Sequence, residues 1–152
     1  MFDMETFKMV HSELIMWMQY IENDLKLVYA TVQEGDFDEN MMKLEKANFG
    51  KIIKAFQNLD KEKQFACFSD DSYSLLKEIQ EMRNYWCHQC YVDFHYYTNQ
   101  REKTKAYKKV AERLHFDEEK IFVLQQQLEN LRVQIVKKYK SGRPQHKTIR
   151  LK

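Results

Sequence analysis

An apolar stripe runs along the early part of the chain and leaves little choice of local structure. Its residues recur at steps of three and four, the spacing of one buried face of an α-helix. The stripe consists of Phe7, Val10, Leu14, Trp17, Ile21, Leu25 and Val28. It predicts one long helix over about residues 4–34, with Gly35 as a cap and Asp38 positioned to start the next helix.

Three further stretches have helical spacing. The second predicts a helix followed by a brief helical turn at residues 65–68, and its apolar positions are Met41, Leu44, Phe49, Ile52, Phe56 and Leu59. The third predicts a helix over about residues 71–97, with N-cap candidates in residues 69–72.

The fourth stretch follows a polar connection at residues 98–105 and restarts a helical pattern at residues 106–114. Asp117 is expected to interrupt or re-cap this pattern. Beyond it, the repeat covers only about two heptads, and its apolar positions are Ile121, Leu124, Leu128, Leu131 and Ile135. We therefore expect this segment to pack against the other helices or a second subunit.

Turn-forming residues are too scarce for a many-stranded sheet, because the 152 residues include three glycines and one proline. The expected fold is all-α, with four to five helices over residues 1–139. Residues 137–152 hold seven Lys or Arg and no acid. We expect residues 140–152 to be a flexible basic tail, which either meets nucleic acid or only aids solubility.

Cysteine usage and hydropathy indicate a cytoplasmic protein. The three cysteines are an odd number, and residues 1–10 lack the basic start and apolar run of a secretory signal. No apolar run approaches the roughly 20 residues of a membrane span. Neither a cofactor nor a membrane partner is expected.

The residues that point to chemistry lie in the third predicted helix. Arg83 has no carboxylate three or four residues away, so it is not an ordinary intrahelical ion pair. On a continuous helix His88 would share a face with Asn84, Tyr91 and His95. Arg83 and His88 are offset by about 140° on an ideal helix, so a symmetric dimer would bring these groups together more easily than one chain. Such a cleft would suit phosphate binding and proton transfer without a metal.

The pattern Arg83-Asn84-x-x-x-His88 resembles the Arg-x(4 to 6)-His motif of the HEPN superfamily, including the polar residue after the arginine. The order of helices extends this resemblance over about residues 4–139. It implies an up-and-down helical bundle of four to five helices that acts as a dimer and cleaves RNA without metal, as a toxin or phage-defence effector. His88 would act as general acid or base around attack by a 2′-hydroxyl, and Arg83 would stabilise the phosphate.

The resemblance also implies auxiliary residues and partners. Asn84 would be a polar contact to RNA, with Tyr91 and His95 as further candidates. An antitoxin, or a nucleotidyltransferase that adenylylates a tyrosine two residues after the histidine, would restrain such a toxin; this chain has Cys90 there and Tyr91 one position later. The alternative function is a non-catalytic HEPN-like module that binds nucleotide, RNA or a protein.

A thiol-metal protein is a second alternative, because Cys87 and Cys90 have the Cys-x-x-Cys spacing of zinc and disulfide sites. Cys67 is the only other thiol, and a closed zinc site needs four ligands. We therefore expect no metal and assign both cysteines to the core or the cleft.

Overall fold

The computed structural model describes residues 3–66 and 68–140, and these residues form helices and connections without a strand. The all-α prediction is confirmed. Six helices follow one another along the described chain: α1 (Met4–Val32), α2 (Phe37–Glu45), α3 (Phe49–Lys63), α4 (Asp70–His88), α5 (Val92–His95) and α6 (Gln100–Lys140).

Short polar side chains fix where the longer helices begin. In each case a side-chain oxygen accepts a hydrogen bond from a backbone N–H of the first turn, which has no partner within the helix. The N-cap residues are Asp3, Asp36, Asn48 and Ser69, and Asn99 accepts in the same way before α6. The start of α4 was therefore predictable from the serines and aspartates around residue 70.

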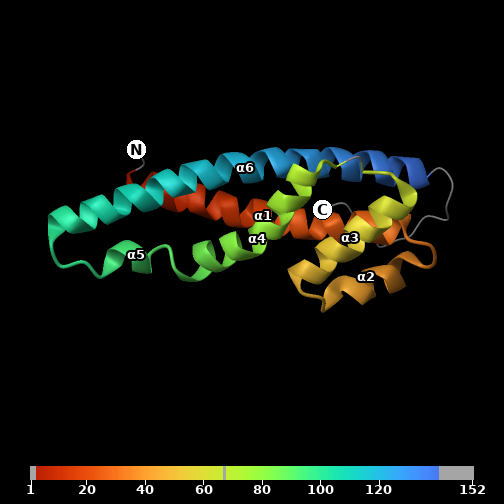
Figure 1. The fold of residues 1–152 in the computed structure, drawn as a ribbon, viewed down its shortest axis with the longest axis horizontal. Helices are drawn as coiled ribbons and strands as arrows, with labels where there is room; N and C mark the ends of the chain where they lie inside the picture. The colour runs from red at the N-terminus through yellow and green to blue at the C-terminus, as the bar shows by residue number, and fades with distance from the viewer. Residues whose placement is uncertain (1–2, 67, 141–152) are drawn as a thin grey trace.

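The two longest helices, α1 and α6, lie side by side and run in the same direction (Figure 1). Three contacts along their length establish this register, because the residue numbers rise together on both helices. They join the rings of Phe7 and Tyr107, the rings of Trp17 and Phe122, and the side chains of Asp24 and Arg132. This parallel pair forms the long axis of the molecule.

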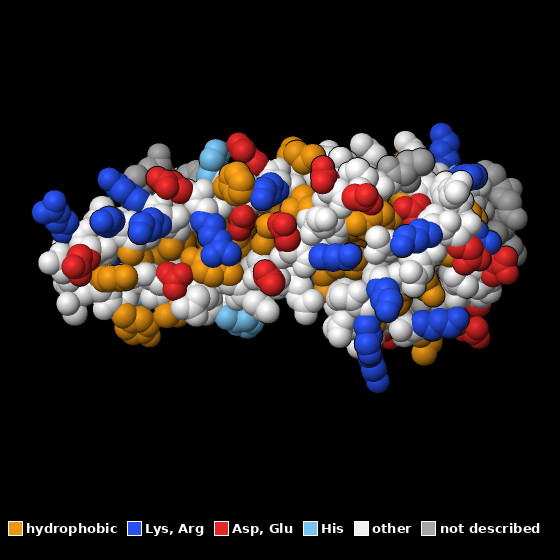
Figure 2. Space-filling model, in the orientation of Figure 1, with side chains coloured by type: hydrophobic (Ala, Val, Ile, Leu, Met, Phe, Trp, Pro, Cys, Tyr) orange, Lys and Arg blue, Asp and Glu red, His pale blue; other side chains and the backbone are white. Residues whose placement is uncertain are grey.

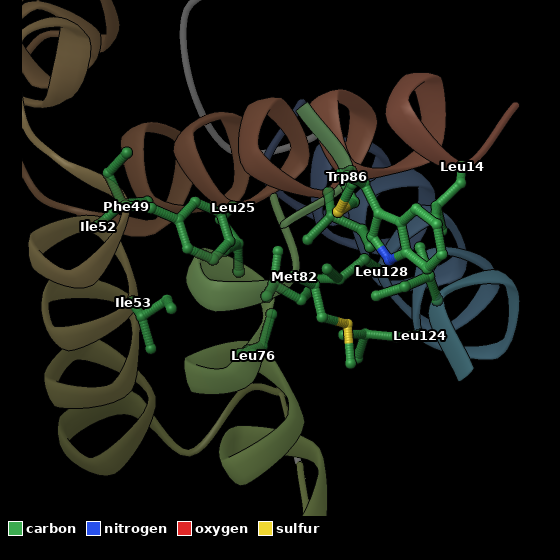
Figure 3. Close-up of a cluster of buried hydrophobic side chains, with 14 of the residues drawn as sticks. Leu14, Leu25, Phe49, Ile52, Ile53, Leu76, Met82, Trp86, Leu124 and Leu128 are labelled. Carbon is green, nitrogen blue, oxygen red and sulfur yellow. The ribbon is translucent and has the colours of Figure 1, made fainter. Parts of the chain in front are cut away.

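Helix α4 packs against α1 and α3, and its Trp86 contacts α6. Figure 3 shows Leu76 and Met82 of α4 between α3 and α6, and Trp86 beside Leu14 and Leu128. Trp86 is almost completely buried, and its indole Nε1 donates to the Asp117 carboxylate of α6 at 2.8 Å. The last turns of α4, which carry the candidate site, are thus anchored from both long helices.

Several details of the predicted helices are wrong in the first half of the chain. The second stripe forms two helices rather than one, because Asn48 caps a new start. Asp36, not Asp38, caps the first of these helices. Residues 65, 66 and 68 form no helical turn. Gly35 has a positive φ of 105°, but it does not cap α1, whose C-cap is Gln33.

The second half differs from the prediction in two ways. The third predicted helix ends at His88, and residues 89–91 form a turn before the short α5. Asp117 neither interrupts nor caps a helix, since α6 is continuous through it and includes most of the predicted connection. A buried aspartate in mid-helix is instead explained by the hydrogen bond from Trp86.

The predicted tail lies outside the described residues except for Lys140, at which α6 ends. Among the described helices, none combines the length and the apolar character that crossing a membrane requires.

Candidate functional site

A surface hollow of about 320 Å³ lies between α1, the start of α3 and the last turns of α4. Arg83, Asn84 and His88 all line it, so these three predicted site residues are brought together within one chain. The 140° offset between Arg83 and His88 does not separate them, because the hollow spans that side of α4. Its remaining lining residues are Glu22, Ala47, Asn48, Phe49, Gln80 and Cys87.

Arg83 has an ion-pair partner that the local sequence could not show. Its Nη1 lies 2.9 Å from Oε2 of Glu22 on α1, 61 positions earlier in the chain. Glu22 also lies 3.8 Å from the Lys26 amino group. The guanidinium is 5.7 Å from the centre of the Phe49 ring, within the range of a cation–π contact. Arg83 is therefore positioned from α1 and α3, with a side chain 35% exposed to solvent.

Glu22 leaves part of the guanidinium free to bind a ligand. An arginine has five N–H donors, and the hydrogen bond to Glu22 uses only Nη1. Counting Lys26, the three charged groups of this cluster carry one net positive charge. A phosphate in the hollow would meet the remaining N–H donors of Arg83.

His88 is the last residue of α4, and its imidazole is exposed at the edge of the hollow. Asn84, one turn earlier, is also exposed and lies on the same side of the helix. An exposed imidazole beside an amide can exchange protons with solvent and with a bound hydroxyl. These two residues are therefore accessible to a ligand in the hollow.

A side chain from α1 explains why α4 ends at His88. The Trp86 carbonyl would ordinarily accept from the amide of Cys90, but His11 Nε2 donates to it at 2.7 Å. The Cys90 amide bonds instead to the Tyr85 carbonyl at 3.0 Å. Sequence reasoning found no role for His11, and no local signal could have revealed a contact 75 residues away.

The end of α4 separates Tyr91 and His95 from the other predicted site residues. Tyr91 packs against Phe7, and its hydroxyl lies 3.4 Å from Nδ1 of His11. His95 is exposed on α5, with its ring against Tyr96. Neither residue lines the hollow, because the turn at residues 89–91 removes the shared helix face on which their prediction depended.

The two described cysteines also have different surroundings. Cys87 is exposed and lines the hollow, whereas Cys90 is buried and its thiol donates to the Trp86 carbonyl at 3.4 Å. Burial raises the pKa of the Cys90 thiol to about 11, so at neutral pH it is protonated and a poor nucleophile. In residues 3–66 and 68–140, no group of three or more His, Cys, Asp or Glu side chains is arranged to hold a metal ion.

The geometry thus combines a positioned guanidinium, an accessible imidazole and an amide around one open hollow. Comparison with models of protein families, with curated proteins and with solved structures found no match to this chain.

Proposed function

We propose that the protein is a HEPN-like, metal-independent endoribonuclease in which Arg83 and His88 form the catalytic pair. The observation that carries the proposal is their position on one solvent-accessible hollow, from residues five apart in the sequence. Asn84 lines the same hollow and is the proposed auxiliary contact to RNA. Tyr91 and His95 are not included in the proposed site, since they lie elsewhere.

The proposed reaction needs one proton acceptor and one phosphate-binding group. His88 would take the proton of a ribose 2′-hydroxyl, whose oxygen bonds to phosphorus as the bond to the 5′-oxygen breaks. The leaving 5′-oxygen takes a proton from water, and the other product ends in a 2′,3′-cyclic phosphate. Arg83 would bind the non-bridging oxygens, on which negative charge develops.

Purified full-length protein, incubated with RNA and an excess of EDTA, tests this proposal. We expect cleavage that leaves 2′,3′-cyclic phosphate ends, with at least a hundredfold loss in His88→Ala and in Arg83→Ala, which is the scale of a lost acid–base or electrostatic group. His95→Ala is the matched control, because that histidine is exposed but outside the hollow. Equal cleavage by all four proteins would refute the assignment.

The ion pair between Arg83 and Glu22 favours a second candidate, a non-catalytic module that binds RNA, nucleotide or a protein. In that case Arg83 has mainly a structural role in joining α4 to α1. Glu22→Gln distinguishes an Arg83 that contacts RNA from one with a purely structural role, and the cleavage assay distinguishes the nuclease from a non-catalytic module. The substitution removes the charge that competes with phosphate, so an RNA-binding site should bind RNA more tightly, whereas a purely structural pair should only lose stability.

The proposal includes a homodimer in the cytoplasm, restrained as a toxin or phage-defence effector by an antitoxin or a nucleotidyltransferase. Large apolar side chains exposed on α1 and α6 support a second subunit, among them Met9, Phe116 and Phe122. Sedimentation equilibrium of the full chain tests the dimer, and a mass equal to one chain at micromolar concentration would contradict it.

A further inference from the structure

Two further hollows lie on the other side of the α4 end, along the first half of α6. The larger has a volume of about 580 Å³, within the range of about 300–1,000 Å³ for ligand clefts. Lys105 lines both hollows, so they adjoin each other, and we call the two together the α6 groove. Its cationic lining residues are Arg101, Lys105, Lys108, Lys109 and Arg113.

The charge of the α6 groove is mostly unneutralised. Within the part of the chain that the structure describes, Lys105, Lys108 and Lys109 take part in no ion pair. Residues 100–113 contain six Lys or Arg against two Glu. Figure 2 shows lysine and arginine side chains gathered over this end of the molecule, with a few acidic side chains among them. Such an excess attracts a polyanion.

The acidic residues of the α6 groove do not cancel this excess. One of them is Asp93, whose carboxylate accepts from the Gln89 side-chain amide at 2.9 Å. Glu102 is the other acid of the lining, in the first turn of α6. Three cations therefore face two carboxylates in the larger hollow, and the smaller one has no acid in its lining.

Aromatic rings lie among these cations. The Arg113 guanidinium lies 3.6 Å above the centre of the Tyr85 ring, which fixes both side chains in the wall of the α6 groove. Tyr97 also lines the groove and is 46% exposed. Cations that follow a phosphate backbone, next to rings on which bases stack, are what single-stranded nucleic acid requires. An acidic protein, the alternative polyanionic partner, would be bound by the cations alone and would not require the exposed ring of Tyr97.

We propose that the α6 groove binds single-stranded RNA, with Lys105 and Lys109 on the phosphates and a base stacked on Tyr97. This inference rests on the proposed function for the choice of RNA. Tyr85 of the groove and His88 of the other hollow lie on the last turn of α4. RNA held in the groove would therefore continue past the end of α4 towards the candidate catalytic pair.

Fluorescence anisotropy measures binding of a labelled 2′-O-methyl oligouridine of twelve nucleotides. This RNA analogue has no 2′-hydroxyl group, so the protein cannot cleave it by 2′-hydroxyl attack. We expect Lys105→Glu/Lys109→Glu to weaken binding at least tenfold. The slope of the logarithm of the binding constant against the logarithm of the salt concentration should be smaller in magnitude by about 1.4 in this double variant. Each phosphate contact on a single strand contributes about 0.7 to that slope. Lys54→Glu/Lys61→Glu is the matched control, since both lysines are exposed on α3 and the charge change is the same. Equal losses in the two double variants, or no loss in the first, would overturn the proposal.

The stacking contact has its own test. Tyr97→Ala should weaken binding of the oligouridine about tenfold, while binding of heparin, which has no bases, should not change. If Tyr97→Ala leaves oligouridine binding intact, the α6 groove is a general polyanion site and the assignment to RNA is wrong. Circular dichroism and thermal unfolding of each variant identify a loss caused by misfolding.

Failure of this inference is distinguishable from failure of the proposed function. RNA cleavage that depends on His88, together with normal oligouridine binding by Lys105→Glu/Lys109→Glu, rejects the α6 groove alone. Weakened binding by that double variant, together with no cleavage by the native chain, rejects the nuclease and leaves an RNA-binding protein.

Discussion

The hydrogen bond from Trp86 to Asp117 should be among the strongest single links that hold the candidate site in place. It joins the last turns of α4 to the middle of α6, and both side chains are buried. Asp117→Ala removes the acceptor and leaves the indole N–H without a partner in the core. Asp117→Asn keeps an acceptor oxygen of nearly the same size.

The expected cost of Asp117→Ala is about 2 kcal/mol. A hydrogen bond to a charged group contributes about 1.5–3 kcal/mol, and a buried donor left without a partner costs about 1–3 kcal/mol. The two values describe the same lost bond, so they are not added. The ion pair with Arg113 at 3.7 Å adds little, because the Arg113 side chain is 46% exposed. The higher helix propensity of alanine returns up to about 0.7 kcal/mol.

Urea denaturation followed by circular dichroism measures this cost as a change in the free energy of unfolding. We expect Asp117→Ala to lower the midpoint of thermal unfolding by about 4–8 °C, and Asp117→Asn to lower it by less. Glu112→Ala, at an exposed position of the same helix, should change stability by no more than about 0.5 kcal/mol. If Asp117→Ala behaves like Glu112→Ala, the bond does not hold α4 against α6 and the reasoning fails.

Three further predictions concern other parts of the fold. Burial raises the pKa of Asp24 to about 6, so its proton stabilises the fold below pH about 4, and this contribution is lost as the pH rises through 6. The free energy of unfolding of Asp24→Asn, minus that of wild type, should therefore rise by about 2 kcal/mol from pH 4 to pH 7, once solvent screening is allowed for. If this difference stays constant across that range, the raised pKa of Asp24 is wrong. Asn40 donates to the carbonyls of residues 30, 33 and 34 and closes the turn between α1 and α2. Asn40→Ala should therefore cost about 2 kcal/mol in urea denaturation, and a cost under about 0.5 kcal/mol would refute this role. Iodoacetamide should alkylate exposed Cys87 at least tenfold faster than buried Cys90, as site-resolved mass spectrometry measures, and equal rates would contradict the burial of Cys90.

The sequence was enough to predict what depends on neighbours along the chain. Apolar residues at steps of three and four predicted the all-α class and the buried faces, and Ser69, one of the predicted N-cap candidates, caps α4. Some of the details that failed also have local causes. Asn48 starts a new helix within an apolar stripe that looks continuous in the sequence. Its extended backbone begins the new helix, while the apolar residues on either side keep their helical spacing.

The tertiary structure decided which distant groups meet, and this fixed the candidate site. The sequence placed Arg83 and His88 near each other, but the pairing of Arg83 with Glu22 depends on how α1 packs against α4. The same packing brings His11 to the Trp86 carbonyl, which ends α4 and moves Tyr91 and His95 away. Periodicity records which face of a helix is buried, but not which helix covers it; contacts between side chains 61 or 75 positions apart exist only in the folded chain.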